Sequence, residues 1–367
     1  MKALRFCSKI NKGDDLSEQK KPLISIIILN YNAGDMLINC VESIFNSKFN
    51  NFEIIVVDNV STDKSHLQCK ERFDQINLIE NRNNLGYCEG NNVGIREAGG
   101  DFFVVLNPDT VVDSSWLDEL LAAFNKYGDG IYQPKILSLN EKNILQSTGN
   151  MIHLFGFGFS RDLGIVDNNQ RNEIEEIGYA AGTCLFTSST TFKKIGLFDP
   201  FIFLYHDDLD FGWRALQQGI KSYYVPLSVV YHVKSYTLKW SAQKFFWLER
   251  NRKYCLLTHY SKKTYRRMLP FLILADILVW FVYLSKGFLM AKIRAELEIM
   301  KNKDQIINKY NELENKKKVQ DKEMIKFFTE NIFVSRNISG GIMSSIFNFV
   351  LSSLSKRARQ SIMSSKS

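Results

Sequence analysis

Three carboxylates stand close together in the stretch "FIFLYHDDLDFGWRALQQG", residues 201–219. If a helix begins at these acids, they suit its first turn, and Asp210 can pair with Arg214 four residues later on the same face. Asp207 could also have this structural role in the first turn. Asp208 is then the carboxylate left to face a crevice, where it could act as a general base on a hydroxyl group.

A second acid follows the apolar run "DFFVVLN", in the sequence "LNPDT". Asn107 and Asp109 come directly after this run, and Pro108 stiffens the spacing between them. A carboxylate here is a hard oxygen ligand for Mg²⁺ or Mn²⁺, and the ion would in turn bind a diphosphate. The alternative is a structural turn in which the Asn side chain bonds its own backbone. These residues alone leave both interpretations open.

A third acid, Asp58, ends the apolar run of "VVDNVSTDKS". At the end of a strand it can accept hydrogen bonds from a nucleobase or a ribose. Ser61, Thr62 and Asp63 are each able to cap the helix that follows. We therefore interpret Asp63 as structural and Asp58 as a candidate binding residue.

Two glycines and a histidine complete the candidates. Gly86 and Gly90 lie in "NLGYCEGNNVGI", where glycine lets the backbone approach a ligand closely. His232 ends the apolar run "SVVYH". A histidine at such a place either has a structural role or contacts a metal ion or a phosphate.

The elements that position these residues alternate between strands and helices. Continuous apolar runs predict buried strands, and apolar spacing of three and four predicts helices. The predicted strands are 23–30, 52–58, 76–81 and 101–107, and the predicted helices are 34–47, 62–73 and 89–99. The alternation predicts an α/β domain with a mainly parallel sheet.

Ligands of such sheets bind beyond the carboxyl ends of the strands. The polar residues at those ends should therefore line one crevice. They are Asn30, Tyr31 and Asn32 after the first strand, Asp58 and Asn59 after the second, and Asn107 and Asp109 after the fourth.

The pattern is more mixed between residues 130 and 235. Residues 149–164 are rich in Gly and Phe and predict a loop or hairpin. Residues 177–196 predict a buried strand and then a helix, and residues 221–233 predict short strands that end at His232.

After residue 240 the chain becomes basic and aromatic, and then strongly apolar over 268–291. Pro270, Asp276 and Lys286 interrupt this stretch, and its apolar part, 269–284, has 16 residues. A spanning helix needs roughly 20 apolar residues, so we expect an interfacial or re-entrant helix rather than a span. Basic residues at 250, 252, 253, 262, 263, 266 and 267 flank its start, as expected on a cytoplasmic side.

These observations divide the chain into four parts. We expect a disordered leader (1–21), the α/β domain (22–240), a basic and apolar helical extension that associates with a membrane (241–330), and a basic tail (331–367).

Composition bounds the class of protein. The 367 residues are 45% hydrophobic and 23% charged, which excludes a wholly disordered chain. A net charge of +8 favours an anionic partner without choosing among nucleic acid, anionic lipid and a phosphorylated substrate. The six scattered cysteines argue against a zinc site and a disulfide framework, and favour the cytoplasm. The N-terminus lacks the apolar region of a secretory signal.

In their order and spacing, these motifs resemble those of glycosyltransferase family 2, most closely its rhamnosyltransferase-like branch. The resemblance covers about residues 23–253. It rests on "IILNYN", "VVDNVSTD", "NLGYCEGNNVGI", "LNPDT", "GTCLF", "FDPFIFLYHDDLDFGWRALQQG" and "VYHV". It implies a GT-A fold, a nucleotide-sugar donor, a divalent ion (Mg²⁺ or Mn²⁺) and an inverting single displacement.

The resemblance also assigns roles to residues. Asp208 matches the second acid of the family's "EDxD" stretch, its catalytic base. Asp109 matches the second Asp of the "DxD" element and, with His232, would bind the metal and diphosphate. Two departures are Asp207, which replaces a common Glu, and His206, which replaces a common aromatic residue and could alter the acceptor site. The donor-binding residues would be Asn30, Tyr31, Asp58, Asn84, Gly86 and Asn107.

The activity implied is transfer of a sugar, possibly rhamnose, to a saccharide or lipid-linked saccharide in the assembly of cell-surface polysaccharide or glycan. The enzyme would lie on the inner face of the plasma membrane, on an anionic lipid surface. Nucleic acid is not an expected partner, because the positive charge gathers beside apolar sequence rather than on an exposed aromatic platform.

Two alternatives make different predictions. A nucleotidyltransferase would want a basic, glycine-rich loop after the first strand, where this chain has "NYNAGDML". A non-catalytic, membrane-surface protein that binds nucleotide sugars through a decayed transferase domain would have lost key acids. Asp58, Asp109 and Asp208 are all present, which argues against decay.

Overall fold

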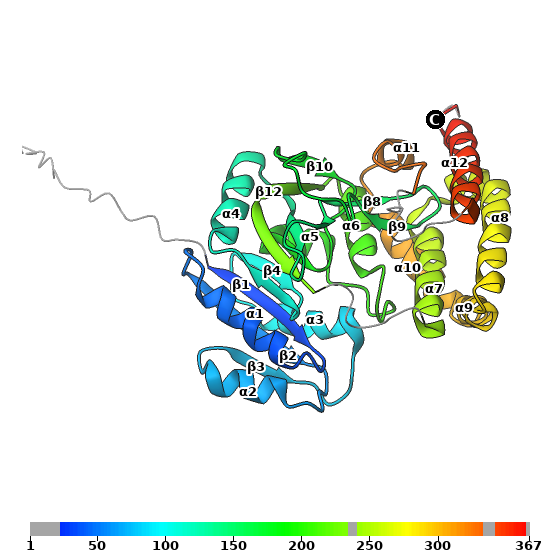
Figure 1. Cartoon of the computed structure of the whole chain (residues 1–367). Coiled ribbons are helices and arrows are strands. Elements are labelled where there is room, and N and C mark those ends of the chain that lie inside the picture. The colour runs from blue at the N-terminus through cyan, green and yellow to red at the C-terminus, as the bar shows by residue number, and fades with distance from the viewer. Residues whose placement is uncertain (1–22, 234–240, 333–341, 365–367) are drawn as a thin grey trace, which may run out of the picture.

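One long sheet forms the centre of the molecule, and Figure 1 shows it in a computed structural model of the chain. The structure describes residues 23–233, 241–332 and 342–364. The leader expected over residues 1–21 lies outside the described residues.

Half of the sheet is parallel, in the order β3-β2-β1-β4. Its elements are β1 (Ile24–Asn30), α1 (Asp35–Phe45), β2 (Phe52–Asp58), α2 (Ser65–Arg72), β3 (Asn77–Glu80), α3 (Gly86–Glu97) and β4 (Phe102–Leu106). The strands and helices predicted for this half are confirmed. The first two strands end in register, with Asn30 opposite Asp58, so their polar ends meet at one edge of the sheet.

The other half makes the sheet mixed. The strand β11 (Cys184–Ser188) lies antiparallel between β4 and β6 (Gly130–Ser138), and β12 (Lys221–His232) runs parallel to β6. The α/β fold class is confirmed, but the parallel pairing predicted for most of the sheet holds for only part of it. The antiparallel strand β11 lies between the two parallel groups and makes the sheet mixed.

The remaining strands are short. They are β5 (Thr110–Val112), β7 (Leu145–Ser147), β8 (Asn150–Ile152), β9 (Gly158–Ser160) and β10 (Glu175–Ile177). The pair β8–β9 is the hairpin predicted within 149–164. Residues 221–232 were expected to form short strands, but they form one strand of 12 residues with an irregularity between Val225 and Val229. Pro226 lies at that irregularity, where a missing N–H is tolerated.

Helices cover both faces of the sheet. Beside α1 to α3, they are α4 (Trp116–Tyr127), α5 (Ser189–Ile195), α6 (Asp207–Gln217), α7 (Ala242–His259), α8 (Lys262–Ser285), α9 (Leu289–Lys301), α10 (Lys303–Lys316), α11 (Asp321–Ile325) and α12 (Ile342–Met363). Within the helical extension expected over 241–330, the charged part after α8 forms three separate helices, α9 to α11. The region predicted as a basic tail contains α12, which lies beside α8 (Figure 1).

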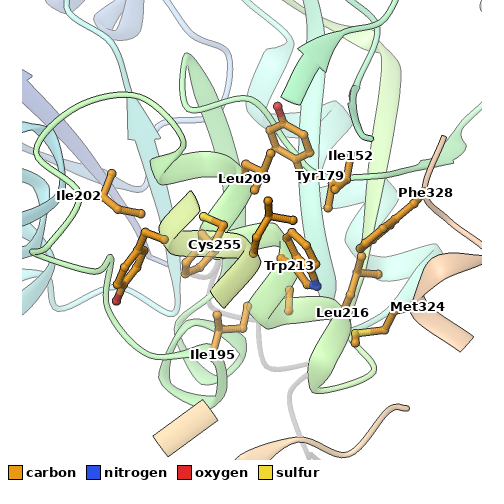
Figure 2. Packing of buried hydrophobic residues seen from close by; sticks show 14 of the residues in the cluster. Ile152, Tyr179, Ile195, Ile202, Leu209, Trp213, Leu216, Cys255, Met324 and Phe328 are labelled. Atoms are coloured by element: carbon orange, nitrogen blue, oxygen red, sulfur yellow. The ribbon is translucent and has the colours of Figure 1, made fainter. Parts of the chain in front are cut away.

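The C-terminal helices share a core with the α/β part. Figure 2 shows Trp213 of α6 close to Phe328, and their ring centroids are 4.9 Å apart. Cys255 of α7 and Met324 of α11 belong to the same buried cluster as Leu209 of α6. The helix that carries the predicted base is therefore packed between the sheet and the C-terminal helices.

Pro270 does not break α8, which runs for 24 residues through it. Ser261 caps the helix by accepting a hydrogen bond from the backbone N–H of Thr264, and Pro270 lies on the exposed side. The carbonyl group that loses its partner there can be hydrated, so the cost of the proline is reduced. By length and composition α8 could cross a membrane, with a mean hydropathy of 2.1 over its apolar window.

The two faces of α8 differ. An inward stripe packs against the molecule and is buried: Thr264, Met268, Leu272, Ala275, Val279 and Tyr283. The outward face, which we call the outer face of α8, is exposed and apolar: Leu269, Ile273, Leu274, Ile277, Phe281 and Leu284.

A buried ionic network fastens α8 to its neighbours. Lys292 of α9 is fully buried, and its Nζ lies 2.5 Å from Glu249 of α7 and 2.7 Å from Asp276 of α8. Arg252 of α7 also contacts both of these acids. Asp276 therefore does not interrupt the apolar helix. It neutralises cations that have little access to water.

We predict that Asp276→Asn lowers the free energy of unfolding by about 3 kcal/mol, because Arg252, Lys253 and Lys292 would then share only two acids, Glu249 and Glu296, and one largely buried positive charge would be uncompensated. Chemical denaturation followed by circular dichroism measures this. Glu312→Gln is the control, because Glu312 and Lys316 form an exposed pair and should contribute less than about 1 kcal/mol. Equal losses in the two variants would contradict the prediction.

Candidate active site

Asn30 joins the loops that follow the first two strands. Its side-chain N–H group donates to Asp58 Oδ1 at 2.8 Å and to the hydroxyl oxygens of Ser61 and Ser65. Asp58 Oδ2 accepts a hydrogen bond from the backbone N–H of Ser61. Asp58 is 3% exposed, so its carboxylate is buried beneath the loop that follows β2, and its hydrogen bonds fix the shape of that loop.

Other residues predicted for donor binding follow β1 or begin α3. Tyr31, directly after β1, is 49% exposed. The side-chain oxygen of Asn84 accepts a hydrogen bond from the backbone N–H of Gly86 at the start of α3. A Cβ atom at Gly86 would lie 2.5 Å from the carbonyl oxygen of Phe203. The close approach predicted at Gly86 is therefore made by the chain itself, and its packing explains the glycine.

The structure brings Asp109 and His232 together. Residue 109 lies between β4 and β5, and β5 pairs with the end of β12, so that His232 stands opposite Thr110. The Oδ1 atom of Asp109 is 3.3 Å from Nε2 of His232. Both side chains are largely but not fully buried, which leaves them accessible from the crevice.

Gln146 of β7 fixes the orientation of this histidine. Its Nε2 group donates to the backbone carbonyl of His232 at 2.8 Å, and its Oε1 lies 2.7 Å from His232 Nδ1. A carbonyl can only accept, so the amide nitrogen must face it and Oε1 must face the ring. Nδ1 then carries the hydrogen, and Nε2 is the ring nitrogen that faces Asp109.

Asp207 and Asp208 begin α6, close to the segment that leads into β11. Asp208 Oδ2 accepts from the backbone N–H of Gly182 at 3.1 Å and from the Asn150 side chain at 3.4 Å. Asn107 donates from its backbone N–H to Thr183, the next residue in that segment. Asp208 and the loop of Asp109 thus contact the consecutive residues Gly182 and Thr183, so they lie on the same rim of the candidate site.

The surroundings of Asp207 and Asp208 affect the pKa values of these two acids differently. Burial, and next the charge of Asp208, raise the pKa of Asp207 well above its usual range. Burial also raises the pKa of Asp208, but N–H groups of Gly182, Leu209 and Asn150 act in the opposite direction. Because two adjacent buried carboxylates do not readily ionise together, Asp208 is the acid better able to hold the negative charge.

The turn before α6 is strained. Tyr205 and His206 both have left-handed backbone angles, with φ of 66° and 64°. The side chain of Asn251, from α7, donates to the carbonyl oxygens of Leu204 and Tyr205 at 2.9 and 2.7 Å. Burial lowers the pKa of His206 to about 4, so this ring is neutral at pH 7.

Asp210 is paired, as the sequence predicts. Its Oδ2 accepts from Arg214 at 2.8 Å, and its Oδ1 is 3.2 Å from Nε2 of His259. Although burial opposes it, Arg214 and then His259 hold the pKa of Asp210 below its usual range. Asp210, Cys255 and His259 lie near enough to one another to hold an ion, but the arginine already neutralises the acid.

The sequence did not reveal Gln146, Asn150 or Asn251. Each is an ordinary amide in a stretch without a distinctive motif, and each acts on a residue 46 to 86 positions away. Only Asn150 had a local signal, since it stands beside a glycine in the predicted hairpin.

The mixed sheet and its flanking helices form a GT-A-like fold. Among solved structures, GalNAc-T7 with UDP, GalNAc and Mn²⁺ matches with a TM-score of 0.56 and 17% identity, over 70% of this chain and 52% of that one. S. aureus TarS 1-349 in complex with UDP-GlcNAc matches with a TM-score of 0.50 and 17% identity, over 92% and 91%. At these identities the likeness shows the fold.

Residues 25–196 match the family model described as glycosyl transferase family 2, so the chain carries a domain of that family. Low-salt glycan biosynthesis hexosyltransferase Agl10 of Haloferax volcanii is 28% identical over 54% of this chain and 62% of its own length. The N-acetylglucosaminyl-diphospho-decaprenol L-rhamnosyltransferase of Mycobacterium tuberculosis is 24% identical over 59% and 77%. These relatives are consistent with the rhamnosyltransferase-like branch.

We predict that the acid limb of the pH–rate profile reports the pair of Asp207 and Asp208. A base must be ionised to act, and the raised pKa places the loss of rate, as pH falls, above the pH expected for an ordinary aspartate. Asn150→Ala removes a hydrogen bond that stabilises the ionised form of Asp208, which raises the pKa of Asp208 further and moves the acid limb to higher pH by about half a unit.

The measurement is the pH dependence of kcat/KM. Asp118→Asn, at an exposed acid of α4, is the control and should leave the limb in place. A limb that stays fixed or moves to lower pH in Asn150→Ala would contradict the assignment.

Proposed function

We propose that this protein is an inverting glycosyltransferase that moves a sugar from a nucleotide-diphosphate donor to a saccharide or lipid-linked saccharide. The observation that carries this proposal is the common rim of Asp208 and the Asp109–His232 pair, linked through Gly182 and Thr183. A base thus stands beside a place suited to a charged leaving group.

In this reaction Asp208 accepts the proton of the acceptor hydroxyl group. The oxygen then attacks the anomeric carbon from the face opposite the diphosphate, whose bond to that carbon breaks with its electron pair. Asp207, with its raised pKa, stays protonated and adds no second charge beside the base. No covalent intermediate with the protein is required.

The pair Asp109 and His232 suits a divalent ion. Two ligands at about 2.1 Å in neighbouring octahedral positions lie about 3.0 Å apart, close to the 3.3 Å between Asp109 Oδ1 and His232 Nε2. A bound Mg²⁺ or Mn²⁺ would offset the charge of the departing diphosphate. The likeness to a structure that holds Mn²⁺ supports a divalent ion.

The donor would lie over the ends of β1, β2 and β4. Tyr31 offers an exposed ring to a nucleobase, Asp58 and Asn30 form the floor beneath it, and Asn107 lies toward the diphosphate. Asn84 and Gly86 shape the start of α3 beside them. The structural neighbours that hold UDP or UDP-GlcNAc support a nucleotide-sugar donor.

Rhamnose as the sugar, and a lipid-linked acceptor, rest on the name of the mycobacterial relative. A role in the assembly of cell-surface polysaccharide or glycan rests on that name and on the glycan biosynthesis enzyme of Haloferax volcanii.

We place the enzyme on the inner face of the plasma membrane, with the outer face of α8 against anionic lipid. The ionic network ties α8 to α7 and α9, so crossing the bilayer would strand buried charge. A helix held on one side and apolar on the other is suited to lie partly in the interface. The proposed functional division is a transferase part up to residue 240 and a membrane-associating part from 241.

We predict that Asp208→Asn lowers kcat by about a thousandfold while donor binding remains, because only the base is lost. Turnover and binding are measured with Mn²⁺ across UDP-, dTDP- and GDP-sugars. A folded wild-type protein that binds none of these donors would refute the transferase and favour the decayed-domain alternative.

We predict that Gln146→Leu weakens Mn²⁺ binding by about ten- to a hundredfold, because the ring of His232 loses the partner that fixes its tautomer. Free Mn²⁺ is counted by electron paramagnetic resonance without any substrate. Gln68→Leu, at an exposed position of α2, is the matched control. Unchanged affinity in Gln146→Leu would remove His232 from the proposed ligand set.

A further inference from the structure

An apolar groove lies away from the candidate active site. It is a groove of about 470 Å³ between the end of α7, the start of α8, and helices α9 and α10. Its walls are almost entirely apolar: Leu257, Tyr260, Tyr265, Ile299, Ile306 and Ile307. Met300 also lines it and is 70% exposed, so the groove is open to the surface.

Three cations stand at the rim of this groove. Lys262 and Arg266 lie one helical turn apart on α8, and Lys303 begins α10. Several other cations of the C-terminal helices, such as Lys253 and Lys309, are paired with acids. Among the described residues, none of the three rim cations makes an ion pair, although Lys262 lies over the ring of Tyr310.

The combination restricts the ligand. An apolar cleft alone would suit many hydrophobic groups, but a rim of positive charge adds a preference for an anion at its mouth. A molecule with a hydrocarbon chain and a phosphate satisfies both parts. A saccharide does not, because the walls offer few hydrogen-bonding groups.

The groove also has a suitable position. The side chain of Gln217, at the end of α6, donates to the carbonyl oxygen of His259, beside the groove. Asp208 lies near the other end of this helix, whose 11 residues span about 16 Å. The groove is therefore separate from the reacting groups, while the outer face of α8 extends away from its rim.

We propose that this groove binds one anionic phospholipid of the membrane, with an acyl chain between α8 and α10 and the phosphate on Lys262, Arg266 and Lys303. The bound lipid anchors the enzyme at the bilayer and selects anionic leaflets. This inference rests on the membrane docking proposed above and adds a defined site to it.

The test uses the full chain and vesicles of phosphatidylcholine, with or without about a third phosphatidylglycerol. Co-sedimentation gives vesicle affinity, and native mass spectrometry gives the number of phosphatidylglycerol molecules retained. Arg266→Glu reverses a rim charge, and Ile307→Trp fills the groove. Arg267→Glu is the matched control, with the same charge change at the next position of α8, outside the groove lining.

We expect the wild type to retain one phosphatidylglycerol molecule. Arg266→Glu should lower affinity for anionic vesicles at least about tenfold and lose the retained lipid. Ile307→Trp should lose it too, whereas Arg267→Glu should keep it.

Other results overturn the proposal in distinguishable ways. If Arg266→Glu and Arg267→Glu lose vesicle affinity equally and no lipid is retained, the attraction to the membrane is diffuse. The proposed membrane docking would then stand, but the lipid site in the groove would be refuted. A concentration-dependent dimer that Ile307→Trp disrupts would assign the groove to a second copy. If the protein binds no vesicle, both the lipid site in the groove and the membrane docking are refuted. Turnover on soluble acceptors would still test the transferase separately.

Discussion

The contact between Asn251 and the turn at residues 204–206 is the constraint on which the site depends. Two consecutive residues with left-handed angles cost free energy, of the order of 1–3 kcal/mol each, and persist only where neighbours hold them. Here an amide of α7 holds both carbonyl groups that precede them. The turn then starts α6 at the point where Asp208 reaches Gly182. The catalytic geometry of the α/β part thus depends on a helix of the C-terminal part.

The first turn of α6 also shows how one short helix gives three aspartates different properties. Asp210 faces Arg214 and His259 and is stabilised as an anion. Asp207 is buried without such a cation, so its proton is retained. Asp208 lies between these extremes, because backbone and amide N–H groups partly replace the water that it has lost. The same residue type therefore serves as an anchor, a neutral neighbour and the proposed base, according to what each one faces.

Sequence reasoning found what local pattern determines. Periodicity gave the strands and helices of residues 23–106, and spacing gave the pair Asp210 and Arg214. It could not find Gln146 or Asn251, because their partners come from elements distant in the chain. It also treated Pro270 and Asp276 as interruptions of an apolar helix. The first judgement failed because Pro270 lies on the exposed side of α8, where the carbonyl group that loses its partner can be hydrated. The second failed because the cations that pair with Asp276 come from other helices, α7 and α9.

The double attachment of α7 has a mechanical consequence. At one place this helix holds the turn before Asp208, and one residue later in the chain Arg252 holds Asp276 of α8. Asp208 and the outer face of α8 are therefore connected through one helix. With that face against a bilayer, this connection would set the distance between Asp208 and the lipid surface. Acceptors would then be sorted by reach, according to how far their hydroxyl group projects from the surface.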